Sequence, residues 1–455
     1  MFSISLIIQD IPWRAPEDCF ASLCDEPYVA FLDSAALGDE RSCCSYLCVE
    51  PLRILRLQQG RMTIDGIYAP GDPLDLLERE LAAYRSTSVS APLAFTGGAI
   101  GFLGYDLGRR LEHIASRHSD TSDMPDMVVG LYDTVFGFDH RSKRAWLVLR
   151  DRPDTDRHTR VTALLGRLQR TRKVSPLPKL DWRPDFARDV YEARVERVRD
   201  YIRAGDISQA NFTLRHTAPR PAELDLPSLY LALRKANPAP FAAYLNCGED
   251  LTLLSASPER FLKLGVDREV EARPIKGTRP RHHDPVRDTA LADELALSIK
   301  DRAENLMIVD LLRNDIGRVA ELGSMRVPEL CQVESFARVH HLVSSVRGKL
   351  RPELGAIDLL RATFPGGSVT GAPKIRAMQI IDELEACQRG PYCGAIAWIG
   401  FDGAMDSSIV IRTIIATPTH LMVQAGGGIV ADSEAAAEYD EMATKSLPLL
   451  EISNV

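Results

Sequence analysis

The order of strand and helix patterns along the chain constrains its fold more than any other feature. Up to about residue 150 the sequence has strand-like patterns, such as the alternation of polar and apolar residues over Arg53–Leu57 and the apolar run Trp146–Leu149. Beyond that point helical and strand patterns follow one another irregularly, and no repeat of fixed period is visible. This order favours an α+β fold over a doubly wound parallel sheet.

A polar, arginine-rich segment that ends in Ser175–Pro178 and Arg183-Pro184 marks the clearest boundary. A chain of 455 residues suggests two or three domain-sized units, or one large interleaved one. We therefore expect an N-terminal region over 1–175 and a second domain over 185–455. In the latter the patterns predict helices from about 184, over 288–314, 373–385 and 433–446, and strands over 241–245, 251–255, 409–416 and 421–424.

Composition excludes several classes of protein. A formal net charge of −8 disfavours a nucleic-acid binder that works by neutralising phosphates. No run reaches the roughly 18 apolar residues of a membrane span, and the start of the chain lacks the basic segment of an export signal. The nine cysteines form no C-x-x-C pair, which predicts free thiols in a reducing cytoplasm. We expect a cytoplasmic enzyme.

Acidic residues recur at helical spacing in two places. Near the C-terminus, Glu434, Glu438, Glu441 and Lys445 fall on one helix face, after the glycine-rich Ala425–Ile429. Spacing alone favours a solvated surface here, but a glycine-rich backbone beside a helix N-terminus suits an anion.

The second acidic helix carries Asp301 and Glu304 as an i, i+3 pair. Carboxylates that face one another from two helices make a hard-oxygen site. Such a site suits Mg²⁺, which usually binds one or two carboxylates and retains water.

Lys276 stands among Arg273, Arg279 and Arg281, with Gly277 beside it. Spacing alone favours an anion-binding loop on a solvated surface. The alternative is a reactive lysine, because cationic neighbours lower the pKa of an amine and leave it neutral and nucleophilic.

Several longer motifs resemble the chorismate-utilising enzymes, the family of anthranilate synthase component I. They are Ser255–Arg260, Pro274–Pro280, Asp301–Asp315, Phe364–Lys374 and Ile411–Thr413. The match runs in order from about Tyr191 to Lys445, with a weaker one through 97–106. The resemblance implies large antiparallel sheets packed as a sandwich, helices outside, and an active site in the C-terminal part.

Within that family, Lys276 and the motif Pro365–Pro373 resemble the corresponding residues of the members that aminate chorismate at ring C4. Anthranilate-forming members, which usually have alanine at the lysine position, remain the alternative. Gln209 stands where isochorismate-forming members place a lysine that activates water, so water addition is disfavoured. A catalytically silent regulatory homologue is a third possibility, and the competent residues at every expected position argue against it.

The resemblance assigns the remaining roles. Glu304 and Glu441 match ligands of Mg²⁺, with Asp301 and Glu438 as outer partners. Arg412 and Tyr392 are expected to contact the enolpyruvyl carboxylate of the substrate, and Gly277 and Thr278 its ring. His341 is expected near the departing hydroxyl. The other anionic groups of the substrate should be contacted by Lys445 together with Gly426, Gly427 and Gly428. The neighbouring His340 is expected to be structural.

Lys276 and Glu259 are expected to carry the bond chemistry, in a transaminase-class amination of chorismate. Lys276 attacks ring C2 while Glu259, with a pKa raised by desolvation, protonates the C4 hydroxyl; ammonia then replaces the lysine. No cysteine lies in a recognisable glutaminase context, so a separate glutamine amidotransferase subunit should supply the ammonia. The implied product, 4-amino-4-deoxychorismate, leads to 4-aminobenzoate and folate.

The N-terminal region of anthranilate-forming members binds tryptophan through a Leu-Leu-Glu-Ser-like segment. Phe31–Ser34 is a faint counterpart here. A pocket near Ser34 and plain strand packing are both compatible with it, and packing is favoured.

Overall fold

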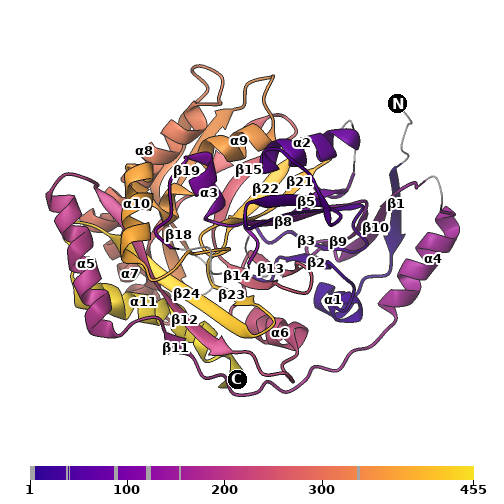
Figure 1. The fold of residues 1–455 in the computed structure, drawn as a ribbon, viewed down its shortest axis with the longest axis horizontal. Coiled ribbons are helices and arrows are strands. Elements are labelled where there is room, and N and C mark those ends of the chain that lie inside the picture. The colour runs from indigo at the N-terminus through magenta and orange to yellow at the C-terminus, as the bar shows by residue number, and fades with distance from the viewer. Residues whose placement is uncertain are drawn as a thin grey trace.

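The computed structural model describes residues 6–36, 39, 41–86, 91–118, 124–152, 155–335 and 339–454. They form two large antiparallel sheets with helices around them (Figure 1). The expected α+β fold is confirmed.

The first sheet contains strands from both halves of the chain. In spatial order they are β1 (Leu6–Ile11), β10 (Arg144–Arg150), β9 (Thr134–Asp139), β3 (Cys44–Cys48), β2 (Ala30–Asp33), β13 (Phe241–Asn246), β14 (Thr252–Ser257), β23 (Thr413–Ala416), β24 (His420–Ile429), β12 (Gln209–Pro219) and β11 (Arg183–Pro184), with β20 (Gly371–Ala372) also paired to β12.

The second sheet is built in the same way. Its order is β17 (Ile275–Pro280), β19 (Val339–Lys349), β16 (Glu269–Ala272), β15 (Arg260–Leu264), β22 (Met405–Ile409), β21 (Ala395–Gly400), β7 (Gly98–Leu103), β8 (Met127–Tyr132), β4 (Arg53–Gln58), β5 (Arg61–Ile64) and β6 (Ile67–Tyr68), with β18 (Arg326–Ser335) paired to β19. Both sheets therefore run across the predicted boundary, which lies in a segment without helix or strand between Leu168 and Arg183.

The helices pack on the outside of the sheets. They are α1 (Pro16–Leu23), α2 (Pro73–Ala83), α3 (Leu107–Leu111), α4 (Arg157–Leu168), α5 (Arg188–Arg203), α6 (Leu226–Ala236), α7 (Pro285–Leu297), α8 (Ile299–Gly317), α9 (Ala356–Thr363), α10 (Lys374–Leu384) and α11 (Ala435–Leu450), with the 3₁₀ turns η1 (Gly367–Val369) and η2 (Ile452–Asn454).

Alternation along the strands divides the core into layers. In β3, Tyr46 and Cys48 face the second sheet, whereas Leu47 faces the layer that α1, α4 and α6 cover. Successive side chains of a strand point to opposite faces, so each central strand is apolar on both sides. A third apolar cluster holds α5, α10 and α11 against β12 and β24.

Two predicted elements differ from the structure. The helix expected over 288–314 is interrupted at Ser298, whose extended backbone ends α7 and whose hydroxyl oxygen accepts the Asp301 backbone N–H at 3.3 Å as the N-cap of α8. The strand expected over 409–416 is interrupted at Arg412, which has a φ of 52°.

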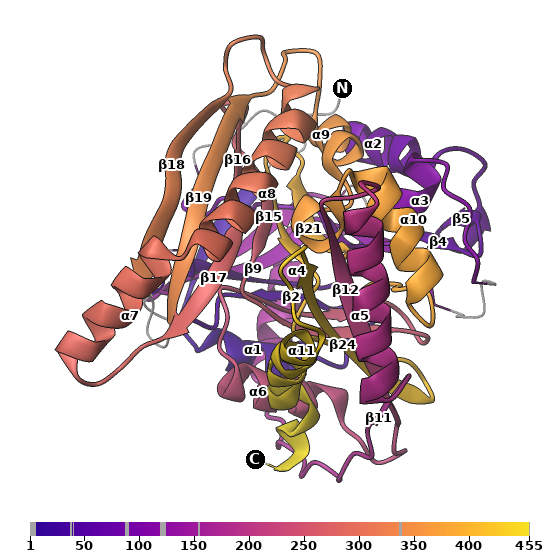
Figure 2. The same cartoon turned by 90° about the vertical axis from the view of Figure 1, so that its left-hand side faces the viewer.

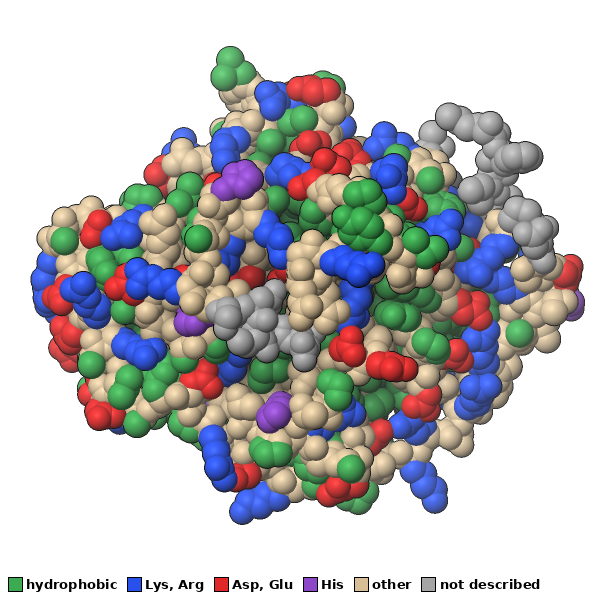
Figure 3. Space-filling view, in the orientation of Figure 1, with side chains coloured by type: hydrophobic (Ala, Val, Ile, Leu, Met, Phe, Trp, Pro, Cys, Tyr) green, Lys and Arg blue, Asp and Glu red, His purple; other side chains and the backbone are tan. Residues whose placement is uncertain are grey.

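Three broader expectations can also be compared with the structure. All nine cysteines are free thiols, as predicted. Acidic and basic side chains are interspersed over the face shown in Figure 3. Within the described ranges, no helix has the length and apolar character needed to cross a membrane.

Candidate active site

Most of the predicted site residues come from β17, α8, β24 and α11. Figure 2 shows α8 lying along β17 and β19, and α11 crossing β24 below it. Gly277 interrupts the β17–β19 register between Lys276 and Thr278, and its φ is +79°. A Cβ at this position would lie 2.8 Å from the Asp301 carboxyl group. Only glycine therefore fits here, and β17 and α8 approach closely at this point.

Glu259 lies in the turn between β14 and β15 and is partly exposed. Its carboxyl Oε1 accepts a hydrogen bond from the Ser368 hydroxyl at 2.9 Å. Desolvation raises the pKa of Glu259, against the opposing influence of the Lys276 and Lys445 ammonium groups. A raised pKa was expected for a carboxyl group that donates a proton near neutral pH.

Three side chains of α11 converge on Gly427. A Cβ on this glycine would lie 3.1 Å from Glu438 Oε2, 3.7 Å from Lys445 Nζ and 4.0 Å from Glu441 Oε1. Lys445 Nζ also donates to the Gly426 carbonyl at 3.0 Å and pairs with Glu441 at 2.6 Å.

The glycine run lies within a strand, whereas the sequence patterns ended the strand at residue 424. Gly426, Gly427 and Gly428 belong to β24 and pair with β12. Because β23 pairs with β24 only over Leu421–Val423, it leaves the second edge of β24 uncovered at the glycines. The backbone there is extended, and Lys445 approaches it.

Three of the four predicted metal ligands, Glu304, Glu438 and Glu441, lie beside ammonium groups, and Asp301 pairs with the Arg279 guanidinium at 3.3 Å. Lys300 Nζ is 4.0 Å from Glu304 Oε1 and 3.8 Å from Glu438 Oε1, so it bridges α8 and α11. Desolvation raises the pKa of Glu304. For Glu441, desolvation also acts upward, but Lys445 holds its pKa below the usual range.

These carboxylates suit a hard cation. Within the described ranges, no three His, Cys, Asp or Glu side chains are close enough to hold a metal ion as they stand. However, Glu304 and Glu438 already share one cation, the Lys300 ammonium, and oxygen donors of this kind are what Mg²⁺ prefers. The donor set therefore fits Mg²⁺ in chemistry.

Arg412 and Tyr392 lie beside this group. The Arg412 guanidinium donates to the Lys445 carbonyl oxygen, and desolvation lowers its pKa, while Tyr392 and Glu441 act on it in the opposite direction. Tyr392 is buried in the loop before β21. An arginine in such a position can hold a carboxylate through two parallel hydrogen bonds.

His341 stands one register pair further along the β17–β19 ladder than Lys276. Its Nδ1 is 2.9 Å from the Thr278 hydroxyl. Burial and the nearby Arg41 lower the pKa of His341 to about 4, so the imidazole is neutral near pH 7. His340 is buried between Asp288 and Ser335, consistent with a structural role.

The arginines around Lys276 do not form the cationic cluster that the sequence suggested. Arg273 pairs with Glu329 and Glu334, Arg279 with Glu294 and Asp301, and Arg281 with Asp288. Their charges are therefore balanced locally. The Lys276 charge instead interacts with three carboxyl groups, those of Glu259, Glu304 and Glu441, and works to lower the pKa of each.

Sequence reasoning assigned no role in the site to Ser368 or Lys300. Ser368 lies inside the motif Phe364–Lys374, and Lys300 directly precedes Asp301, but neither has a spacing that indicates a contact. Gln209, in contrast, was singled out. Its side chain is buried against Gly428, and neither of its amide atoms has a hydrogen-bond partner among the described residues.

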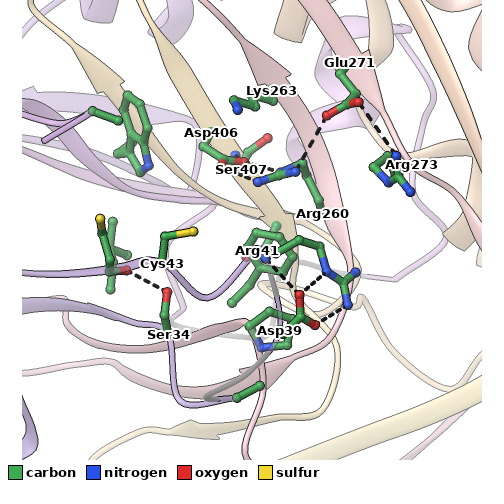
Figure 4. A pocket seen from close by; sticks show the side chains of 18 of the residues that line it. Ser34, Asp39, Arg41, Cys43, Arg260, Lys263, Glu271, Arg273, Asp406 and Ser407 are labelled. Atoms are coloured by element: carbon green, nitrogen blue, oxygen red, sulfur yellow. Dashed lines mark hydrogen bonds and ion pairs between the residues drawn. The ribbon is translucent and has the colours of Figure 1, made fainter. Parts of the chain in front are cut away.

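A cavity of about 1810 Å³ lies outside this group of residues. Figure 4 shows Ser34, Asp39 and Arg41 on one side of it and Arg260 and Asp406 on the other. Strand packing alone was favoured for Phe31–Ser34; β2 does pack as a strand, but Ser34 lines the cavity. The cavity borders His341 but not Lys276, Glu304 or Glu441.

The chain is similar to known proteins over most of its length. The sequence model of the chorismate binding enzyme family matches residues 29–451. Aminodeoxychorismate synthase component 1 of Klebsiella aerogenes is 44% identical over 439 residues, which is 95% of each chain. Anthranilate synthase component 1 of Thermus thermophilus is 39% identical over 447 residues, 96% of this chain and 95% of that one.

A solved structure supports the same relationship. Anthranilate synthase component I from Streptococcus pneumoniae aligns with a TM-score of 0.81 at 36% identity, covering 91% of this chain and 93% of that one. The chain therefore belongs to the chorismate binding enzyme family. Among these relatives, identity is highest to aminodeoxychorismate synthase component 1, the member type that Lys276 indicated.

Proposed function

We propose that this protein converts chorismate and ammonia to 4-amino-4-deoxychorismate. The observation that carries the proposal is the position of Lys276. The positive charge of its ammonium group works to lower the pKa of Glu259, the candidate acid. It has the same effect on Glu304 and Glu441, the candidate metal ligands. A nucleophile, an acid and a cation site thus meet in one place. Similarity to aminodeoxychorismate synthase component 1 supports the choice of product.

Glu304 and Glu441 would hold Mg²⁺, with Asp301 and Glu438 as outer partners. When bound, the ion supplies positive charge that neutralises the ring carboxylate of chorismate and polarises the ring. Arg412 and Tyr392 would hold the enolpyruvyl carboxylate, and Lys445 with Gly426–Gly428 the remaining anionic groups. Gly277 and Thr278 would line the ring.

Lys276 carries out the first substitution as an amine, after its ammonium group has released a proton to water. Its Nζ forms a bond to ring C2, the ring double bonds shift, and the C4–O bond breaks. Glu259 gives its proton to the departing hydroxide, so water leaves and a carboxylate remains. The neutral His341 can hydrogen-bond to the departing oxygen without adding charge.

Ammonia completes the reaction. It forms the C4–N bond while the C2–Nζ bond breaks, and Lys276 returns to a neutral amine. The Glu259 carboxylate takes one proton from the new ammonium group, which restores the acid. Dividing one difficult substitution into two directs the amine to C4 instead of C2.

We infer that the ammonia comes from a glutamine amidotransferase subunit and that the product serves 4-aminobenzoate and folate synthesis. The nine cysteines provide no evident glutaminase nucleophile: where the surroundings shift a thiol, as at Cys247 and Cys393, burial raises its pKa to about 12. The word "component" in the relatives' names agrees with a partner subunit.

The test is to supply chorismate, Mg²⁺ and ammonium to the wild type and to Lys276→Ala, and to separate the products. Wild type should form 4-amino-4-deoxychorismate, and Lys276→Ala should lose most of this activity. Some addition at C2 is expected in this variant, because the shortened side chain leaves space beside that carbon. Lys263→Ala, at an exposed position on β15 of the same sheet, is the matched control and should retain activity.

Two outcomes would count against the proposal. Formation of 4-amino-4-deoxychorismate by Lys276→Ala at the wild-type rate would exclude covalent catalysis by this lysine. Anthranilate as the main product of the wild type would instead favour the alternative, anthranilate synthase component I.

A further inference from the structure

The Ser368 hydroxyl donates a hydrogen bond to the Glu259 carboxyl group. Among the residues that the structure describes, Ser368 is the sole hydrogen-bond donor to this carboxyl group, at 2.9 Å on Oε1. The other hydrogen bonds of Glu259 involve its backbone, through Ser257 and Ile409. Oε2 is therefore left for a proton and for the substrate.

The backbone that carries Ser368 is fixed from both sides. The next residue, Val369, offers its carbonyl to the buried Arg389 at 2.7 Å. On the other side, the buried Lys374 donates to the Thr363 carbonyl at 2.8 Å and to Asp315 at 2.6 Å. The turn η1 thus presents the hydroxyl in a defined place.

We propose that Ser368 is a positioning residue that orients Glu259 and makes Oε2 the oxygen that carries the transferred proton. The inference rests on the proposed function, in which Glu259 is the acid. In the acid form, Ser368 donates to the carbonyl-like Oε1, so the proton resides on Oε2. After the proton has left, the same hydrogen bond stabilises the carboxylate until ammonia arrives.

The hydrogen bond also sets the acidity of Glu259. A donor to a carboxylate favours the charged form, so Ser368 lowers the pKa of Glu259 and partly offsets desolvation. The other groups that act on Glu259 are Lys276 of β17, Lys445 of α11 and Cys393. Burial raises the pKa of the Cys393 thiol to about 12, so it is neutral, and none of the three changes when Ser368 is replaced.

The choice of substitution follows from the space around Ser368. A cavity of about 10 Å³ borders both Ser368 and Glu259, which is room for one water molecule. In Ser368→Ala, a water could replace the lost hydroxyl and hide its role. Threonine and valine are better, because they have the same shape and only threonine keeps the donor.

The experiment compares wild type, Ser368→Thr and Ser368→Val, with ammonium and Mg²⁺ saturating. The kcat and the pH profile of kcat/KM for chorismate are measured. Loss of the donor raises the pKa of Glu259, so in Ser368→Val the basic limb should move to higher pH. The kcat should fall about tenfold or more, the scale of a hydrogen bond to a charged group, with little change in KM. Ser368→Thr should resemble the wild type.

Each other outcome has a definite meaning. If Ser368→Val keeps the wild-type kcat and basic limb, or if the threonine and valine variants are equally impaired while still folded by circular dichroism, the hydroxyl does not position Glu259. Failure of the wild type itself to form 4-amino-4-deoxychorismate would instead overturn the proposed function. The control is Ser116→Val, because Ser116 donates to Asp382 at 3.0 Å outside the site and should leave the profile unchanged.

Discussion

Replacing Arg389 by methionine should destabilise the protein strongly. The Arg389 side chain is 1% exposed and Glu385, its partner, is 3% exposed. The guanidinium makes two hydrogen bonds to Glu385, at 2.7 and 2.9 Å, and two to the carbonyl oxygens of Val369 and Asn211. Methionine fills similar space but leaves the Glu385 charge and two carbonyls without this partner.

Removing one partner of a buried ion pair costs about 3–5 kcal/mol, because the other charge stays buried. For a chain of 455 residues, an unfolding entropy of roughly 2 cal/mol/K per residue gives about 1 kcal/mol per degree. The Arg389→Met variant should therefore melt about 3–5 °C below the wild type. Differential scanning fluorimetry measures this shift directly.

The matched control is Arg203→Met at the end of α5. Arg203 pairs with Asp200 at 2.9 Å, but both side chains are about half exposed. Such pairs contribute roughly 0–1 kcal/mol, so the melting temperature should change by about 1 °C or less. If Arg389→Met also melts within about 1 °C of the wild type, the buried pair does not hold η1 and the region around it as described.

Two further predictions concern the metal and the ammonia source. Glu304→Gln and Glu441→Gln should each weaken Mg²⁺ binding by at least the roughly 10–100-fold known for outer partners of a metal, as measured by isothermal titration calorimetry. The control Glu434→Gln, at the exposed start of α11, should leave Mg²⁺ affinity unchanged. Unchanged affinity in both site variants would refute the two-helix site. With glutamine as the only nitrogen source the chain should be inactive, and ammonium or an added amidotransferase subunit should restore turnover; glutamine-dependent activity of the chain alone would contradict this.

Much of the site could be predicted because its residues lie in contiguous motifs or on helical faces. The acidic pairs on α8 and α11 were recognised from i, i+3 and i+4 spacing, and Glu259 and Lys276 only from the motifs around them. The resemblance also gave the sandwich of antiparallel sheets, which periodicity alone did not show. Helical spacing and motif resemblance are both properties of short stretches of the sequence, so they can be recognised without the structure.

What could not be predicted depends on contacts between distant segments. Ser368 meets Glu259 across 109 residues, and Lys300 joins α8 to a helix that starts beyond residue 430. The arginines around Lys276 indicated a cationic cluster because their carboxylate partners on α7, α8 and β18 are not visible from spacing. The cavity beside Ser34 similarly needs both sheets, since its other wall includes Arg260 and Asp406.

The balance of charges in the site links the metal to the substrate. Glu304, Glu438 and Glu441 lie near the ammonium groups of Lys276, Lys300 and Lys445 and the guanidinium of Arg412, and Asp301 pairs with Arg279. Chorismate brings two carboxylates, and Mg²⁺ brings two positive charges. Either one alone would leave uncompensated charge among partly desolvated groups, which is costly. Together they preserve the balance, so on the proposed function the ion and the substrate stabilise one another in the site, and Lys276 is freed from the carboxylates that now surround it.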